Sequence, residues 1–364
     1  MNDLAALFQP LTFAHGPAMK NRLMLAPLTN LQSHADGTMS EDEFNWLVKR
    51  AEGGFGLTMT CAAHVQRIGQ GFPGQLGIWS DDHLPGLTRL AAAIKANDSI
   101  AIVQLHHAGM RSPAELIGEA PVCPSENAEF GARALTGQEV EQLRDDFIAA
   151  ALRARAAGFD GVELHGAHGY VLCQFLSAGV NQRTDQWGGS LENRTRIVRE
   201  ILSAVRERCG PDFIVGVRLS PERFDLKLPE IRRFAGDLML HHDIDFLDMS
   251  LWDVGKAPVD PEFQERSLLD WFTDLPRGAC RLGVAGKIMD PAQAAELLGK
   301  GVDYVLLGRA AILHHDWPLR AAAEDGFKPV GLPVTRAYLA GEGLGPAFQD
   351  YMAGWKGFVA EEAA

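Results

Sequence analysis

The sequence has few cysteines and no closely spaced pair of them. Its five cysteines are scattered through 364 residues, and no two form a Cys-x-x-Cys motif. Structural zinc sites and iron–sulfur clusters use closely spaced cysteine ligands, and disulfide-rich secreted domains are denser in cysteine than this chain. We therefore expect a protein of the reducing cytoplasm, with no structural zinc and no iron–sulfur cluster.

Long apolar runs and clusters of basic residues are also missing. No apolar stretch is long enough to span a bilayer, and the start, MNDLAALFQP, lacks the basic and apolar regions of a signal peptide. The net charge is −13, and the lysines and arginines are scattered. Nucleic acids and anionic membranes bind basic surfaces, so we expect neither as a partner.

Short apolar runs alternate with helical patterns along the chain. Eight runs have largely apolar interiors, as expected of parallel strands that are covered on both faces. These runs are Arg22–Ala26, Leu57–Cys61, Ile100–Gln104, Gly161–Leu164, Ile214–Arg218, Phe246–Met249, Arg281–Ala285 and Tyr304–Leu307. The predicted helices are Phe44–Ala51, Leu87–Asn97, Thr136–Ala157, Glu192–Cys209, Pro229–Leu240, Leu268–Leu275 and Pro291–Leu298.

Three of these helices begin with capping signals. Thr136 and Glu139 form a Thr-x-x-Glu capping box, Ser190 precedes the fourth helix, and Asp290 stands directly before Pro291. A hydroxyl or carboxylate at such a position accepts a hydrogen bond from the first helical turn. The signals therefore support helices that begin close to these residues.

Eight strands, each followed by a helix or a long loop, predict a closed (β/α)8 barrel, the TIM barrel of the α/β class. The rival is a doubly wound open sheet, but no Gly-x-Gly-x-x-Gly follows the first strand. We expect residues 1–364 to form a single domain with long βα loops, in which residues 331–364 are a C-terminal extension.

The loops that follow the predicted strands carry the candidate site, because a barrel builds its active site at the C-terminal ends of its strands. Two late loops place glycines beside a cation, at Gly286-Lys287 and Gly308-Arg309. Glycine lets backbone N–H groups approach an anion closely, and arginine presents a planar fork to phosphate oxygens. The pattern favours a phosphate site, while the alternative is a pair of turns with a surface arginine.

Gln104 and Arg218 end two other predicted strands and should face the same mouth. A glutamine amide offers donors and an acceptor, and an arginine offers a fixed positive charge. Together they suit the edge of a polar planar ring such as a flavin pyrimidine. Taken singly, each is more often an ordinary structural residue, and Arg218 could pair with a strand-end carboxylate.

The stretch GVELHGAHGY places His165, His168 and Tyr170 after the fourth predicted strand, with almost no other bulky side chain between them. Two histidines at this spacing are candidate metal ligands, but no obvious carboxylate completes a site. One histidine could instead cap a backbone carbonyl. The arrangement favours two hydrogen-bond donors for an oxyanion beside a phenolic proton donor.

With these residues in place, the sequence resembles the Old Yellow Enzyme family of FMN-dependent oxidoreductases over about residues 7–314. Any one of the similar segments could arise by chance, but their order and spacing together are specific. The segments are KNRLMLAPLT at residues 20–29, LGIWSD at 76–81, QLHHAG at 104–109, HGAHGY at 165–170 and NQRTDQWGGSLENR at 181–194.

The resemblance implies noncovalent FMN in the barrel mouth and ping-pong hydride transfer from NADPH or NADH to the C=C bond of an activated alkene, such as an enone. It implies that His165 and His168 bind the substrate carbonyl oxygen and that Tyr170 protonates the α-carbon. The implied cofactor-binding residues are Pro27, Leu28, Thr29, Ala62, Gln104, His165, Arg218, Gly286, Lys287, Gly308 and Arg309. No metal is implied.

Several positions depart from the family pattern. Thr29 stands where some members have cysteine, Leu31 replaces a pocket tyrosine of one bacterial subgroup, and Met110 replaces an arginine. The subgroup's C-terminal Tyr-x-Arg-Gly-Trp, which reaches a neighbouring subunit, is missing. These changes put substrate range and assembly in question, and a homo-oligomer is left open.

Two further hypotheses stay open beside an ene-reductase. A flavin-binding storage or sensor protein would need none of His165, His168 and Tyr170. A metal-dependent barrel hydrolase would use the histidines as ligands.

Overall fold

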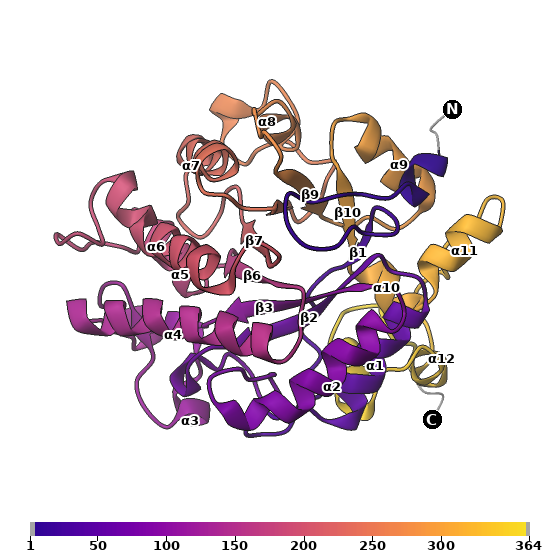
Figure 1. Cartoon of the computed structure of the whole chain (residues 1–364), viewed down its shortest axis with the longest axis horizontal. Coiled ribbons are helices and arrows are strands. Elements are labelled where there is room, and N and C mark those ends of the chain that lie inside the picture. The colour runs from indigo at the N-terminus through magenta and orange to yellow at the C-terminus, as the bar shows by residue number, and fades with distance from the viewer. Residues whose placement is uncertain (1–3, 362–364) are drawn as a thin grey trace.

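The computed structural model describes residues 4–361, and its centre is a closed barrel of eight parallel strands (Figure 1). The order around the ring is β1-β10-β9-β8-β7-β6-β3-β2. The strands are β1 (Leu23–Leu25), β2 (Leu57–His64), β3 (Ile100–His106), β6 (Gly161–Gly166), β7 (Ile214–Leu219), β8 (Phe246–Ser250), β9 (Arg281–Ala285) and β10 (Tyr304–Leu307). Each predicted strand overlaps one of these, which confirms the TIM barrel.

Helices surround the ring in Figure 1 and cover the outer faces of the strands. The large ones are α1 (Glu41–Glu52), α2 (Leu84–Lys95), α4 (Gly137–Ala156), α6 (Leu191–Cys209), α7 (Leu228–His241) and α9 (Pro291–Gly299). The capping box of Thr136 with Glu139 is present, and Ser190 and Asp290 accept hydrogen bonds from the backbone of their helices. The helix predicted at Leu268–Leu275 is present but shorter, as α8 (Asp270–Thr273).

Aromatic rings fill the interior of the barrel opposite glycines. A Cβ atom on Gly216 would lie 2.1 Å from the Phe246 ring, and one on Gly283 would lie 2.2 Å from the Tyr304 ring. The missing side chains thus make room for the two rings, which are fully buried. The barrel is a packed core below its mouth, so a ligand can enter only at the strand ends.

Several short elements lie in the loops and were not predicted. The loop after β3 contains α3 (Ala114–Ile117) and a small parallel pair of strands, β4 (Val122–Cys123) and β5 (Arg133–Ala134). The others are α5 (Val171–Leu176), α10 (Arg309–Leu313), α11 (Trp317–Ala323), α12 (Arg336–Gly341) and α13 (Pro346–Ala353). None of the helices within residues 4–361 is long and apolar enough to cross a membrane.

The described part of the C-terminal segment, residues 331–361, folds back onto the barrel. The backbone of Val334 donates to the carbonyl of Phe358 at 3.0 Å, and the ring of Phe348 packs edge-on against Trp46 of α1 at 5.4 Å. The backbone N–H of Gly345 donates to Gln32 Oε1 in the loop after β1 at 2.8 Å. These contacts place α13 beside the mouth of its own barrel.

Candidate functional site

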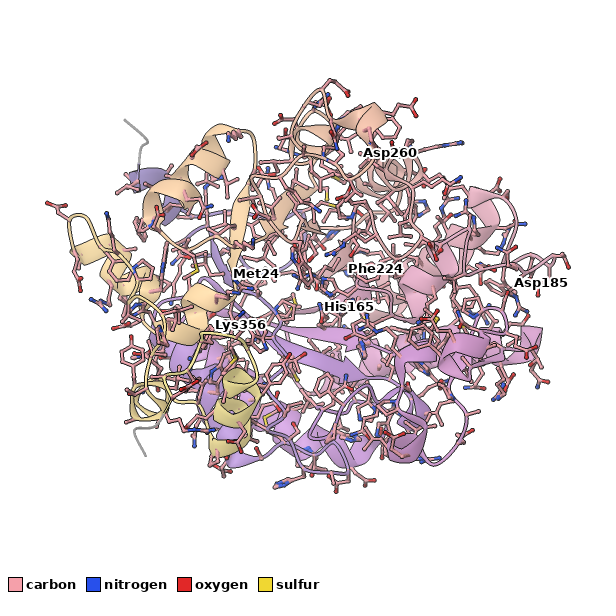
Figure 2. All side chains as sticks on the ribbon, turned by 180° about the vertical axis from the view of Figure 1, so that it is seen from behind. Met24, His165, Asp185, Phe224, Asp260 and Lys356 are labelled. Atoms are coloured by element: carbon pink, nitrogen blue, oxygen red, sulfur yellow. The ribbon has the colours of Figure 1, made fainter. Side chains whose placement is uncertain are left out.

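Two adjoining cavities open at the C-terminal ends of the strands. One, of about 190 Å³, lies at the ends of β9 and β10, and the other, of about 270 Å³, lies at the ends of β2, β3 and β6. Both are lined by Pro27, Leu28, Arg218, Trp252 and Trp355, so they form one elongated site. Figure 2 shows His165, which lines the second cavity, near the middle of the molecule.

Nearly all of the residues predicted from the sequence line this elongated site. The exception is Leu31, which is missing from both linings. The first cavity takes Gly286, Lys287, Gly308 and Arg309, the second takes Thr29, Ala62, Gln104, His165, His168 and Tyr170, and Pro27, Leu28 and Arg218 belong to both.

The first cavity has the chemistry of an anion site. A Cβ on Gly286 would lie 2.9 Å from the backbone nitrogen of Asp253, so no larger residue fits without displacing the chain. Lys287 Nζ pairs with Asp253 Oδ2 at 3.0 Å, which partly offsets its charge. The exposed guanidinium of Arg309 lies 5.2 Å from the centre of the Trp355 ring, and the residue lines this cavity.

Arg218 pairs with a strand-end carboxylate and also lines the site. Its Nε lies 3.1 Å from Oδ2 of the buried Asp248 on the neighbouring strand, an ion pair without good hydrogen-bond geometry. Its Nη2 also lies 3.4 Å from Ser250 Oγ, and the residue lines both cavities. The arginine is therefore held by a strand-end carboxylate and still faces the site.

The two histidines of the second cavity are hydrogen-bonded to each other. His165 Nδ1 accepts from the backbone N–H of Ala167 at 3.3 Å, so the ring proton of His165 lies on Nε2, 3.2 Å from His168 Nδ1. His168 Nε2 then donates to Ser250 Oγ at 2.7 Å. Burial, followed by nearby charges that include Arg218, holds the pKa of both imidazoles well below the usual range. Both rings are thus neutral and offer N–H donors.

The backbone of His168 is held in an unusual conformation. Its φ of 61° lies in the left-handed region, which non-glycine residues seldom adopt. The His168 N–H donates to Ser220 Oγ at 3.0 Å, and Arg111 Nη1 donates to the His168 carbonyl at 2.6 Å. These contacts fix the direction of the imidazole into the cavity.

Tyr170 meets the histidines edge-on. Its ring centre lies 5.1 Å from that of His165 and 4.3 Å from that of His106, and the Arg111 guanidinium lies 5.1 Å from the Tyr170 ring centre. Burial raises the pKa of the Tyr170 phenol above its usual value. The phenol is protonated at neutral pH and can serve as a proton donor.

The sequence did not reveal some of the lining residues. Ser250 is the last residue of β8 and Trp252 lies two residues beyond it, so the strand-end argument applied to that strand would have found them. Tyr351, Met352 and Trp355 come from α13 and the turn after it, and no motif marks them. Phe72 and Ile312 complete the unpredicted lining of the second cavity.

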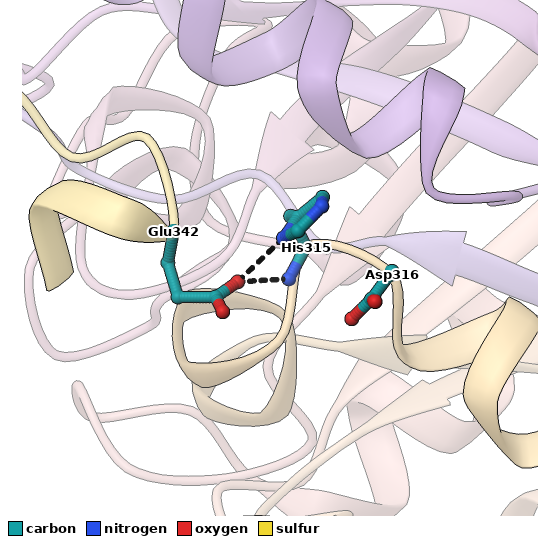
Figure 3. A group of neighbouring side chains, drawn as sticks. All are labelled: His315, Asp316 and Glu342. Carbon is teal, nitrogen blue, oxygen red and sulfur yellow. Dashed lines mark hydrogen bonds and ion pairs between the residues drawn. The ribbon is translucent and has the colours of Figure 1, made fainter. Parts of the chain in front are cut away.

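A group of one histidine and two carboxylates, His315, Asp316 and Glu342, shares no residue with the linings of this site (Figure 3). Glu342 Oε2 accepts from both the backbone N–H and Nδ1 of His315, at 2.6 and 2.7 Å, and Arg50 donates to the Glu342 carbonyl at 2.7 Å. A cavity of about 600 Å³, larger than either cavity of the mouth, lies beside His315 and Asp316. Glu342 thus links the end of α12 to His315 and to Arg50 of α1.

The elongated site fits FMN in shape and in charge. A flat ring with polar edges suits the second cavity, where Gln104 and Arg218 face apolar neighbours, and a phosphate suits the cationic, glycine-lined first cavity. The residues expected at the ring and those expected at the phosphate thus lie at opposite ends of one elongated site.

Comparison with known proteins agrees with this geometry. The family model for the NADH:flavin oxidoreductase / NADH oxidase family matches residues 6–325. A probable NADH-dependent flavin oxidoreductase of Bacillus subtilis is 38% identical over 325 residues, which are 86% of this chain and 87% of that protein. An NADPH dehydrogenase of Bacillus licheniformis is 33% identical over 336 residues, which are 89% of this chain and 96% of that protein.

Among solved structures, the old yellow enzyme homologue from Zymomonas mobilis superposes with a TM-score of 0.80 and 28% identity. The match covers 95% of this chain and 99% of that chain. The barrel, its mouth and the sequence thus agree over nearly the full described length. The chain belongs to the NADH:flavin oxidoreductase / NADH oxidase family, as an FMN-binding, NAD(P)H-dependent oxidoreductase of the Old Yellow Enzyme type.

Proposed function

We propose that the enzyme reduces the C=C bond of activated alkenes such as enones and enals. The observation that carries the proposal is the presence of two neutral imidazoles and a protonated phenol in the cavity that also holds Thr29, Gln104 and Arg218. Bound FMN supplies the hydride chemistry, with NAD(P)H as the donor.

His165 and His168 would bind the carbonyl oxygen of the alkene. In the structure, the ring N–H of His165 donates to His168, and the ring N–H of His168 donates to Ser250. A substrate oxygen must therefore replace these internal bonds. Donors aimed at the carbonyl oxygen stabilise the negative charge that develops there as hydride reaches the β-carbon.

Tyr170 would complete the reduction by giving its phenolic proton to the α-carbon. The substrate then gains a hydride and a proton, the C=C bond is lost, and the tyrosine recovers its proton from solvent. Since the phenol pKa is raised, the proton is present throughout the neutral range.

The experiment that tests the proposal compares the two half-reactions of Tyr170→Phe. Enone-driven flavin reoxidation should slow by about 10²–10⁴-fold, as is typical for loss of a general acid, while reduction by NADPH should change little. Anaerobic stopped-flow traces of each half-reaction provide the measurement. Phe147→Leu, which changes a buried aromatic residue of α4 outside both cavity linings, serves as the control.

The alternative is a flavin-binding storage or sensor protein with low turnover. Such a protein would bind FMN but would not be reoxidised by cyclohexenone faster than free flavin. Equal reoxidation by the wild type and Tyr170→Phe would also contradict the proposed role of the phenol.

A further inference from the structure

A layer of charged side chains lies inside the barrel, among the residues that support the elongated site. Strands β6 and β8 lie on either side of β7. The strand pairing places Asp248 of β8 directly beside Arg218 of β7, whereas Glu163 of β6 pairs with Gly216, two residues before Arg218. Glu163 stands two residues before His165 on the same strand, so both side chains point to the same face. Glu163 and Asp248 are fully buried, and Arg218 is 5% exposed.

This layer has two carboxylates but one cation. Arg218 pairs with Asp248, whereas Glu163 forms no ion pair within residues 4–361. Its Oε1 accepts a hydrogen bond from the neutral amide of Gln104 at 2.6 Å, and its Oε2 has no partner among the described residues. Taking an unpaired carboxylate out of water costs so much free energy that the group takes up a proton instead.

We propose that Glu163 is a positioning residue that carries a proton at neutral pH, and that its neutrality keeps the charge of Arg218 available to FMN. With Glu163 neutral, Arg218 and Asp248 balance each other and the layer has no net charge. When Glu163 ionises, the layer becomes negative beside an anionic ligand, and FMN should bind more weakly. The proposal rests on FMN binding alone and does not depend on alkene reduction.

The titratable and charged groups around Glu163 inside the barrel support a protonated Glu163. Burial first, and the charge of Asp248 second, raise the pKa of Glu163 to about 8, while Arg218 and Gln104 act in the opposite direction. Burial also raises the pKa of Asp248 to about 6, which leaves Asp248 the more acidic of the two. Tyr304 of β10 has a phenol pKa well above its usual value, mainly through burial, and His165 is neutral, so neither adds charge.

The competing explanation is that Glu163 only links β3 to β6 through Gln104. An ionised carboxylate and a protonated one would serve that purpose equally. This explanation predicts no change in FMN affinity when the pH passes through the pKa of Glu163.

The test is the dissociation constant of FMN for the apoprotein, measured by quenching of flavin fluorescence from about pH 7 to about pH 9. The FMN phosphate has a second pKa of about 6 and is already a dianion over this range. The wild-type dissociation constant should rise several-fold above about pH 8. Glu163→Gln, an isostere of the protonated acid, should match the wild type at pH 7 and stay unchanged to pH 9.

Glu163→Asp keeps an ionisable group and should retain an alkaline rise. A wild-type affinity that is constant across the range would overturn the proposal without any variant. The proposal is also wrong if Glu163→Gln keeps the alkaline rise, or if this variant, folded by circular dichroism, binds FMN much more weakly than the wild type at pH 7.

Discussion

At the scale of single residues, the neutral imidazoles of His165 and His168 are the feature most open to a direct test. Two N–H donors that point to one oxygen stabilise an anion there and lower the pKa of a bound phenol. Titration of the FMN-loaded enzyme with p-hydroxybenzaldehyde should therefore give a long-wavelength charge-transfer band as the phenolate stacks on the flavin. His168→Ala should weaken both the binding and the band, and fully loaded wild type that shows no band would contradict an oxyanion site.

Arg309 and Lys287 provide a matched pair of cations at the proposed phosphate end. Arg309→Ala should weaken FMN binding by about 1.5–3 kcal/mol at most, the worth of a hydrogen bond to a charged group. Lys287→Ala should cost less, because Lys287 already pairs with Asp253 at 3.0 Å. Apoprotein titrations with FMN measure both, and an Arg309→Ala variant that binds as tightly as the wild type would show that the phosphate lies elsewhere.

The residues of the site differ in how well a sequence can predict them. Gln104, His165 and Arg218 end apolar strands, so the periodicity of the chain alone places them at one mouth. Leu31 was assigned from the family pattern but lies outside both linings, and its backbone adopts a left-handed φ of 59°. Trp252, 59% exposed, lies just beyond a strand that was predicted but whose end was not considered.

At the scale of elements, strand positions follow from burial but strand ends do not. The predicted run at Leu57–Cys61 continues to His64, and the run at Ile100–Gln104 continues to His106, because the backbone of the residues at the mouth still pairs between the strands. The packing of the segment after residue 331 is harder to predict, since some of its aromatic residues pack on the outer helices and others line the site. Only the tertiary contacts show that Phe348 packs on Trp46 whereas Trp355 lines both cavities.

The packing of α13 on α1 should contribute to the stability of the whole protein. Phe348 is fully buried against Trp46, so Phe348→Ala should lower the free energy of unfolding by about 3–5 kcal/mol, the usual loss for a truncated core phenylalanine. FMN binding should weaken as well, because Tyr351, Met352 and Trp355 belong to the same segment. Urea unfolding and FMN titration measure the two effects, with the exposed Leu319→Ala as control. Normal stability in Phe348→Ala would show that the segment packs elsewhere.

At the scale of the whole molecule, buried ionisable groups make the free energy of unfolding depend on pH, carboxyl groups as the pH rises and histidines as it falls. Burial raises the pKa of the carboxyl groups of Glu43, Glu163 and Asp248, so the stability linked to their protonated forms is lost as the pH rises through their folded-state values. Histidines act in the opposite direction. Burial first, in each case, lowers the pKa of His64, His106, His107, His165 and His168.

These histidines set the behaviour of the apoprotein in acid. An imidazole with a folded-state pKa below its unfolded value of about 6.5 contributes stability that is complete above that value and is lost as the pH falls. Each such histidine adds up to about 1.4 kcal/mol per pH unit to the slope of unfolding free energy against pH. We therefore expect the apoprotein to be most stable near neutral pH and to lose stability steeply below about pH 6.

His107 allows this origin of the acid sensitivity to be tested, since burial lowers its pKa to about 3 and it lines neither cavity. Its ring packs closely over Gly69, where a Cβ would lie 2.4 Å from it, so an imidazolium there would be charged and without water. His107→Asn should reduce the acid slope by about 1.4 kcal/mol per pH unit, whatever it costs at pH 7. The exposed His34→Asn should leave the slope unchanged. Urea unfolding at a series of pH values supplies both slopes, and equal slopes for His107→Asn and the wild type would mean that His107 does not contribute to the acid sensitivity.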